Sequence, residues 1–174
     1  NSRGAFSLKE IDGVSPDASN IIHIKYDSPF NYSEANNLAA SRAKGDFLIF
    51  LNDDTEVISP DWIEAMLEHA RRPEVGVVGA RRLYQDRGIQ HAGVFLVDSG
   101  GAGRHAFRNQ RESTYHDLGA AVRNCSAVTF ACVMVRGDVF KRLNGLDEGL
   151  KVECNDVDLC LRARALGYLV VWTP

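Results

Sequence analysis

Hydrophobic and polar positions fall into blocks along most of the chain, and the blocks have two different periods. Short apolar runs predict strands at 21–24, 47–51, 75–80, 89–97, 126–135 and 168–172. Between them, apolar residues recur at helical spacing and predict helices at 33–44, 60–70, 138–143 and 155–166. Strands that alternate with helices predict an α/β protein with a mostly parallel open sheet flanked by helices.

Three segments of this pattern carry further information on fold and function. The run 47–51 is continuously apolar and bounded by turn signals, which is typical of a strand buried on both faces. Residues 98–124 show little periodicity, so we expect a long loop there, and such loops often serve function. Residues 1–20 are polar and weakly patterned, and we interpret them as a linker or cloning remnant before one domain at 21–174.

Composition narrows the class of protein. The chain has 174 residues and a net charge of -3, without a face or run rich in Lys and Arg, so we expect no nucleic-acid partner. Its longest apolar run is too short to span a bilayer, and the N-terminus lacks the apolar region of a signal peptide. The four cysteines fit no zinc-binding spacing. We therefore expect a cytoplasmic location with free thiols.

An acidic cluster, Asn52-Asp-Asp-Thr-Glu56, directly follows the apolar run. Ligands of open α/β sheets bind outside the carboxyl ends of the strands, and adjacent carboxylates there suit Mg²⁺ or Mn²⁺ together with phosphates. A solvated turn before a helix is the other interpretation. A calcium loop is excluded, because Val57 and Ile63 stand where it needs Gly and Glu. The Asp-x-Asp-x-Thr order of aspartyl-phosphate phosphatases is also absent.

A second acidic cluster, Glu153 to Asp158, opens the last predicted helix, with Asn155 as the expected cap. At 100° per residue, Asp156 lies at the edge of the apolar face. Asp158 lies opposite, one turn before Arg162, where the two can form an ion pair. Asp156 has no cation one turn later, so it is a candidate general base. An acidic first-turn residue favoured by the helix dipole explains it equally well.

The two clusters and their contexts resemble family 2 glycosyltransferases. The stretch 43–57 is similar to the strand and metal-binding DxD region of that family. The stretches 144–148, 155–162 and 167–174 are similar to its acceptor-side signature. Three further segments stand in the expected order, at 77–80, 90–93 and 128–136. The resemblance covers roughly 21–174, and it depends on both motifs in this order.

The resemblance implies a GT-A fold with a divalent metal, Mg²⁺ or Mn²⁺, and it assigns four site residues. By position, Asp54 resembles the metal ligand, and Asp53 resembles a partner that touches the ribose or the metal. Asn37 falls where the family often has Asn in the helix before the DxD strand. Asp156 matches the inverting base of an acidic pair, whose first member here is Asn155.

The implied reaction transfers a sugar from a nucleotide-diphosphate donor to a glycan or lipid-linked acceptor, as in polysaccharide biosynthesis, with the inner membrane face as a plausible place of action. Complete members begin with a nucleotide-binding strand, helix and strand, which we do not find before Ile21, and they commonly continue past Pro174. We therefore expect a truncated version of the domain. It is either a fragment or a half-domain that associates with itself or with a partner chain.

Two other functions remain open at this point. One is a non-catalytic fragment or binding module that keeps the fold but lacks the full donor site. The other is a metal phosphohydrolase built on Asp53 and Asp54, which leaves Asp156 unexplained. Among the smaller signals, His91 is expected as a core or edge residue of a strand, although it can also approach a substrate. The 98–124 segment contains two histidines and three arginines that either close over a diphosphate or are solvated: Arg104, His105, Arg108, Arg111 and His116.

Overall fold

The computed structural model describes residues 21–96, 103–111 and 118–174. Its centre is a five-stranded sheet with the order β1-β8-β2-β9-β7. The strands are β1 (Phe47–Leu51), β2 (Val75–Ala80), β7 (Arg123–Asn124), β8 (Cys132–Arg136) and β9 (Leu169–Thr173). Two small antiparallel pairs lie beside it, β3 (Arg82–Leu83) with β4 (Ile89–His91) and β5 (Val94–Leu96) with β6 (Gly103–His105).

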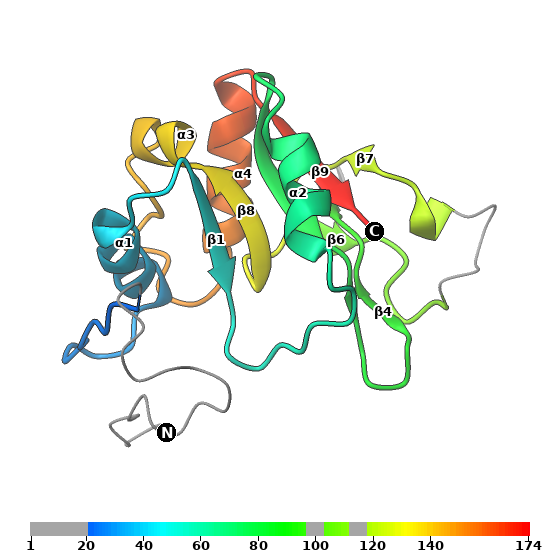
Figure 1. The fold of residues 1–174 in the computed structure, drawn as a ribbon, viewed down its shortest axis with the longest axis horizontal. Helices are drawn as coiled ribbons and strands as arrows, with labels where there is room; N and C mark the ends of the chain where they lie inside the picture. Colours follow the sequence, from blue (N-terminus) through cyan, green and yellow to red (C-terminus); the bar gives the residue numbers. More distant parts are fainter. Residues whose placement is uncertain (1–20, 97–102, 112–117) are drawn as a thin grey trace.

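Helices cover both faces of the sheet (Figure 1). Three pack on one face, namely α1 (Tyr32–Arg42), α3 (Gly137–Arg142) and α4 (Asn155–Ala165). The helix α2 (Trp62–Ala70) packs on the other face, and a short 3₁₀ turn forms at Leu118–Ala120. The predicted α/β class with flanking helices is confirmed, and the helices lie close to their predicted positions.

The strand directions differ from the expected mostly parallel sheet. Among the described strands of this sheet, only β2 and β9 pair in parallel, whereas β8 is antiparallel to both β1 and β2, and β7 is antiparallel to β9. The chain crosses from β1 through α2 to β2, and β1 and β2 are not neighbours in the sheet. The strand β8 lies between them and runs in the direction opposite to both. Because β1, β2 and β9 still run the same way, their C-terminal ends share one side of the sheet. We call this side the carboxyl edge.

The strand β1 is an edge strand and is not buried on both faces. Within the described residues it pairs with β8 alone, and α2 contacts β2, β8 and β9 instead. Ile49 and Leu51 are therefore 37% and 49% exposed, whereas Phe50 is buried on the opposite face. The apolar run predicted the strand and its bounds, but a run alone cannot reveal a missing neighbour.

Other departures from the predicted elements have local causes. Residues 21–24 do not form the predicted strand. They pair with no strand in the described ranges, and Ile22 is 61% exposed. The predicted strand at 89–97 breaks at Gly93, whose φ of +90° reverses the chain into a separate strand, β5. The expected loop at 98–124 contains β6 and β7, which are too short to show a period. The predicted linker 1–20 lies outside the described residues.

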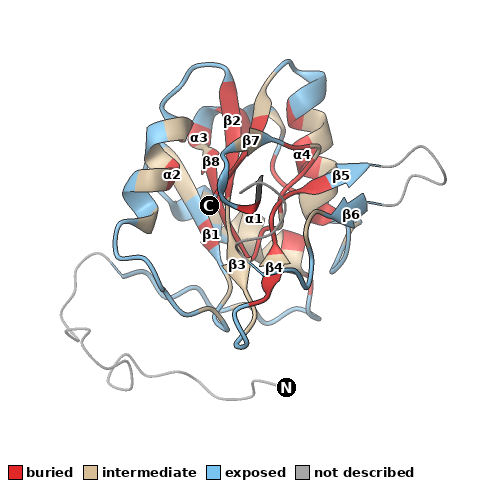
Figure 2. Ribbon diagram, turned by 90° about the vertical axis from the view of Figure 1, so that its right-hand side faces the viewer, coloured by how far each residue is buried: buried red, intermediate tan, exposed pale blue. Residues whose placement is uncertain are grey.

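The core is split by the sheet into two clusters, and Figure 2 shows the buried residues concentrated in the central strands and the inner sides of the helices. The larger cluster includes Trp172, which is 0% exposed and stacks under the Arg123 guanidinium at 4.1 Å. Trp172 therefore packs in the core against the sheet. Trp62 packs against the smaller cluster from α2, as its helical spacing predicted.

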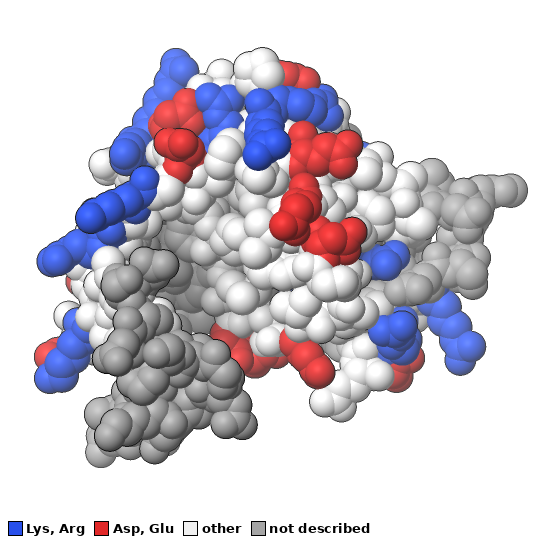
Figure 3. Space-filling model, in the orientation of Figure 1, with Lys and Arg blue, Asp and Glu red and all other residues white. Residues whose placement is uncertain are grey.

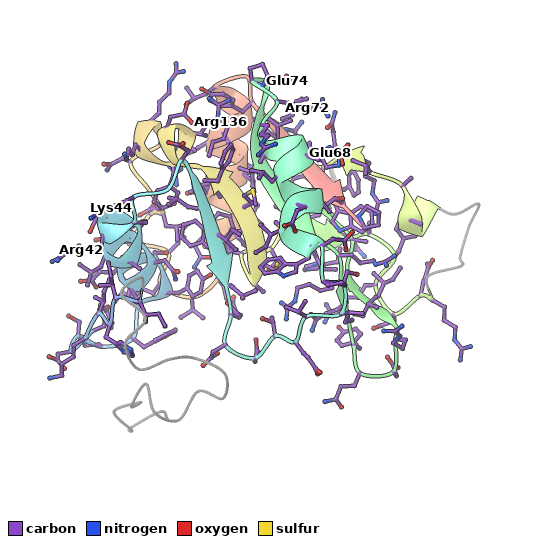
Figure 4. All side chains as sticks on the ribbon, in the orientation of Figure 1. Arg42, Lys44, Glu68, Arg72, Glu74 and Arg136 are labelled. Atoms are coloured by element: carbon purple, nitrogen blue, oxygen red, sulfur yellow. The ribbon has the colours of Figure 1, made fainter. Side chains whose placement is uncertain are left out.

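Charged side chains form ion pairs at the end of the sheet opposite the carboxyl edge. Figure 4 shows Arg72, Glu74 and Arg136 near one another there. Arg72 pairs with Glu74 at 2.8 Å, and Arg136 pairs with Asp138 and donates to the Pro73 carbonyl at 2.7 Å. Figure 3 shows Lys and Arg interspersed with Asp and Glu on this face, without a continuous basic surface. No helix in the described ranges is long and apolar enough to cross a bilayer.

Candidate functional site

The first acidic cluster lies at the carboxyl edge, directly after β1. The Asn52 amide donates to the Ala131 carbonyl at 3.0 Å, and the Thr55 hydroxyl closes the turn on the Asn52 carbonyl at 2.7 Å. Asp53 and Asp54 form the tip of this turn and are exposed. Neither carboxylate makes a hydrogen bond or an ion pair with another side chain in the part of the chain that the structure describes, so both are available to a ligand.

The residues of this turn fit a divalent cation that a bound ligand completes. Across the described ranges, no three His, Cys, Asp or Glu side chains converge into a cluster that could hold a metal alone. Mg²⁺ commonly binds through one or two carboxylates, waters and the phosphates of a substrate. The Asp53-Asp54 turn offers two such carboxylates in an open setting. This donor set fits a metal that arrives with a diphosphate better than a resident structural ion.

The second acidic cluster opens α4, where Asp156 is half-buried. Its Oδ1 accepts from the Val157 amide at 2.8 Å. The Tyr32 phenol lies beside it and donates to the Phe130 carbonyl at 3.1 Å. Burial, followed by the nearby Asp156 charge, raises the pKa of Tyr32 to about 12. Tyr32 therefore stays a neutral hydrogen-bond donor at physiological pH.

The start of α4 differs from the expected cap. Cys154 takes the cap position in a left-handed conformation with φ 63° and gives no side-chain bond to the helix. Asn155 is buried and directs its amide to the Leu150 and Val152 carbonyls, both at 3.4 Å. It holds the preceding turn rather than capping the helix, so the predicted cap is wrong. The start of a helix carries a partial positive charge from its N-terminal amides, and it favours an anionic neighbour.

The predicted pair of Asp158 and Arg162 is confirmed. Two Arg162 nitrogens donate to Asp158 Oδ2 at 2.8 and 2.6 Å. Arg162 also donates to the Leu143 and Gly145 carbonyls at 2.7 and 3.0 Å. Asp158 thus fixes an arginine that ties α4 to the end of α3, whereas neither Asp156 nor the exposed Glu153 has a cationic partner among the described residues.

One segment joins the two clusters. We call residues 127–131, which lead into β8, the connecting segment. Its Ala131 carbonyl accepts from Asn52, next to Asp53, and its Phe130 carbonyl accepts from Tyr32, beside Asp156. Its Val128 carbonyl accepts from the Cys160 thiol of α4 at 3.8 Å. Sequence spacing did not reveal this role, because the segment looked like the first half of a strand.

Two histidines meet at the same edge. His91 at the end of β4 is 1% exposed, and its Nδ1 lies 3.0 Å from Nδ1 of His105 at the end of β6. Its Nε2 accepts from the Gly93 and Thr129 amides at 3.3 and 3.4 Å. Burial is the main cause that lowers the pKa of His91 to about 3. His91 is thus a core residue, as expected. Its contact with His105 was not predicted, because the two residues are 14 positions apart in the sequence.

Asn37 lies on α1 and clamps the turn after α3. Its amide nitrogen donates to the Leu146 carbonyl and to Glu148 Oε1, at 2.9 and 3.0 Å, and its oxygen accepts from the Leu146 amide at 2.9 Å. Gly145 has φ +72°, and a Cβ there would collide with the Asn37 amide. These contacts give Asn37 a structural role, and donor binding by Asn37 stays a prediction. His116 lies outside the described residues.

A comparison with family models decides the classification. Residues 7–143 match the model described as glycosyl transferase family 2. The chain belongs to this family. The match covers the acidic turn and the connecting segment and ends before α4, so it does not extend to Asp156.

Two curated relatives of this family 2 chain are much longer proteins. An uncharacterized protein, y4gI, of Sinorhizobium fredii is 45% identical over 148 residues, covering 84% of the chain and 16% of the relative. The O-antigen biosynthesis protein RfbC of Myxococcus xanthus is 41% identical over 155 residues, covering 88% and 12%. The chain therefore spans less than a fifth of the length of either relative.

A solved structure shows the same fold. The crystal structure of GalNAc-T7 with UDP, GalNAc and Mn²⁺ superposes with a TM-score of 0.67 at 14% sequence identity. The match covers 87% of this chain and 30% of GalNAc-T7. The resemblance to the GT-A fold that the two motifs suggested is thereby confirmed.

Proposed function

We propose that this chain is the acceptor-side part of an inverting glycosyltransferase that uses a nucleotide-sugar donor and Mg²⁺ or Mn²⁺. One observation supports this best: the connecting segment ties the Asp53-Asp54 turn and the Asp156 end of α4 to the same edge of the sheet. A diphosphate-metal group at the turn and a hydroxyl at Asp156 can then meet over one surface. The similarity to an O-antigen biosynthesis protein favours a polysaccharide or lipid-linked acceptor.

The residues have separate tasks in this proposal. Asp54, with Asp53, holds the metal, which offsets charge on the departing diphosphate when it is bound. Asp156 accepts the proton of the acceptor hydroxyl. The acceptor oxygen then forms a bond to the anomeric carbon as the bond to the diphosphate oxygen breaks on the opposite face. Positioned base catalysis of this kind contributes about 10²–10⁴-fold.

A calorimetric titration tests the donor half. The purified protein is titrated with UDP, GDP and dTDP, each with and without Mn²⁺; UDP with Mn²⁺ is the first choice because both are present in the GalNAc-T7 structure. We expect metal-dependent binding of one nucleotide, lost in Asp54→Ala because the cation loses its ligand.

The matched control is Glu56→Ala, an exposed carboxylate of the same segment that is not at the tip of the turn. We expect it to bind like the wild type. If both variants lost nucleotide binding equally, the loss would be caused by the change in net charge and not by the removal of a metal ligand. A folded wild-type protein that binds none of the nucleotides would contradict the proposal and favour a non-catalytic binding module.

A further inference from the structure

The His91–His105 pair has no assigned role, and His91 accepts from Thr129 of the same connecting segment that accepts from Asn52 and Tyr32. Figure 2 shows β4, which ends at His91, buried in the interior, and β6, which ends at His105, on the exposed side. The two rings meet edge to face at 79°, with their Nδ1 atoms 3.0 Å apart. The pair therefore links the core to the surface beside the carboxyl edge.

The hydrogen bonds of His91 determine which of its nitrogens has the proton. Nε2 lies within reach of two backbone amides, those of Gly93 and Thr129. An amide can only donate, so this nitrogen must be the acceptor, and the proton of the neutral ring is on Nδ1. Gly93 presents its amide because of its φ of +90°, a conformation that favours glycine.

The tautomer of His91 also determines the tautomer of His105. Only one proton fits between the two facing Nδ1 atoms, and His91 supplies it, so His105 Nδ1 accepts. The neutral His105 ring then has its proton on Nε2. This nitrogen makes no hydrogen bond with any residue in the described ranges, and its ring is partly exposed.

Three charged or titratable groups act on His105. Burial lowers its pKa first and the nearby Arg108 guanidinium lowers it further, while the Asp156 carboxylate raises it, and the net shift is downward. His91, whose proton the ring accepts, is neutral as well. A neutral N–H donor thus lies close enough to Asp156 to feel its charge.

We propose that His105 binds the acceptor: its Nε2–H donates to an oxygen adjacent to the hydroxyl that Asp156 deprotonates, and His91 is a positioning residue that fixes the ring and its tautomer. This rests on the proposed function and narrows the acceptor class. A neutral N–H beside a carboxylate suits two neighbouring oxygens of an uncharged sugar, one giving up a proton and one accepting a hydrogen bond.

The tautomers of His91 and His105 can be determined without an enzyme assay. Long-range ¹⁵N–¹H correlation spectra of histidine-labelled protein at pH 7 distinguish Nδ1–H, Nε2–H and charged rings. We expect Nδ1–H for His91 and Nε2–H for His105, assigned by His91→Gln and His105→Gln. The opposite tautomer at either ring, or a charged His105, would overturn the proposal.

Kinetics test the acceptor contact. His105→Leu removes the donor, so we expect the acceptor KM to rise about tenfold, the effect of one lost hydrogen bond, while donor KM and donor hydrolysis stay unchanged. His105→Gln, whose amide nitrogen reaches the Nε2 position, should restore most of the loss, whereas His105→Asn should not. His69→Gln on α2, away from the site, serves as the control.

The outcomes separate this inference from the proposed function. Transfer by the wild type with an unchanged acceptor KM in His105→Leu would overturn the inference alone. Absence of both transfer and metal-dependent nucleotide binding in the wild type would overturn the two together. His91→Phe removes the hydrogen-bond acceptor of the Gly93 and Thr129 amides. If this variant does not fold, the His105 variants alone test whether His105 binds the acceptor.

Discussion

The two acidic clusters have similar compositions but different surroundings. Asp53 and Asp54 are exposed at the tip of a turn and bond to no other side chain in the described structure. Asp156 and Asp158 are half-buried at the start of a helix, where one lies beside Tyr32 and the other holds Arg162. In the proposed function, this difference assigns ligand binding to the exposed pair and proton transfer to Asp156, while Asp158 supports the structure through Arg162.

This division has a physical basis. An exposed carboxylate keeps its hydration until a cation replaces it, and therefore it suits reversible binding of a metal with a diphosphate. A half-buried carboxylate is partly shielded from water and has a fixed geometry, which suits a base that must meet one hydroxyl. A carboxylate whose oxygen accepts two hydrogen bonds from one arginine already has its cationic partner. The three predictions below test this division, from the largest effect to the smallest.

Asp156→Asn should give the largest change. Asparagine keeps the size and the oxygen that accepts from the Val157 amide but cannot take a proton. We expect the transfer rate to fall about 10²–10⁴-fold, with metal-dependent nucleotide binding unchanged. Rates are measured with the donor whose nucleotide binds in the titration.

Asp158→Asn is the matched control for this change, since it removes a charge two residues away that contacts Arg162 instead of a substrate. Its transfer rate should stay within a few-fold of the wild type. If the two variants lost activity equally, the assignment of different roles within the second cluster would be wrong.

Arg162→Met should reduce stability rather than chemistry. The change removes the bonds to Asp158 and to the Leu143 and Gly145 carbonyls, and it leaves these acceptors partly buried. We expect the free energy of unfolding to fall by about 2 kcal/mol, measured by urea denaturation. Arg164→Met, at an exposed position of the same helix, should change it by less than about 0.5 kcal/mol.

The third prediction concerns His91, which bonds to the connecting segment between the clusters. Its pKa is lowered to about 3 in the folded protein, mainly by burial, from an ordinary value of 6.5. Its contribution is therefore fully present above pH 6.5 and is lost as the pH falls toward 3. We expect this residue alone to add a slope of up to about 1.4 kcal/mol per pH unit.

Denaturation at several pH values between 7 and 4 measures this slope, and His91→Gln should lack the share that belongs to His91. His23→Gln, an exposed histidine, is the control and should keep the wild-type slope. A wild-type slope that persists in His91→Gln would show that other groups cause the acid sensitivity.

The sequence predicted features that depend on near neighbours along the chain. The bounds of β1, the helical face of Trp62 and the pair of Asp158 with Arg162 all follow from periods of a few residues. The two motifs also indicated the GT-A fold that the comparisons confirm. The antiparallel insertion of β8 between β1 and β2 could not be predicted, because strand order depends on long-range pairing.

The site shows the same limit. Asp53, Asp54 and Asp156 were predicted as site residues because each belongs to a compact motif, and their roles stay predictions. Tyr32 and Phe130 were not, since their contact joins residues 98 apart in the sequence. The cap of α4 was misassigned because the Asn155 side chain donates to a carbonyl of the preceding turn instead. Helix propensity at a single position does not predict such a bond.

The central claim is that the exposed turn and the end of α4 form two sides of one site, and paramagnetic broadening by Mn²⁺ tests it most directly. In amide spectra with the best-binding nucleotide, Mn²⁺ should broaden Thr55 and Ala131 most, then Val157, and should affect Glu74 and Asp138 at the opposite end of the sheet least. Asp54→Ala should abolish this gradient. Broadening of Glu74 or Asp138 ahead of Val157 would contradict the account.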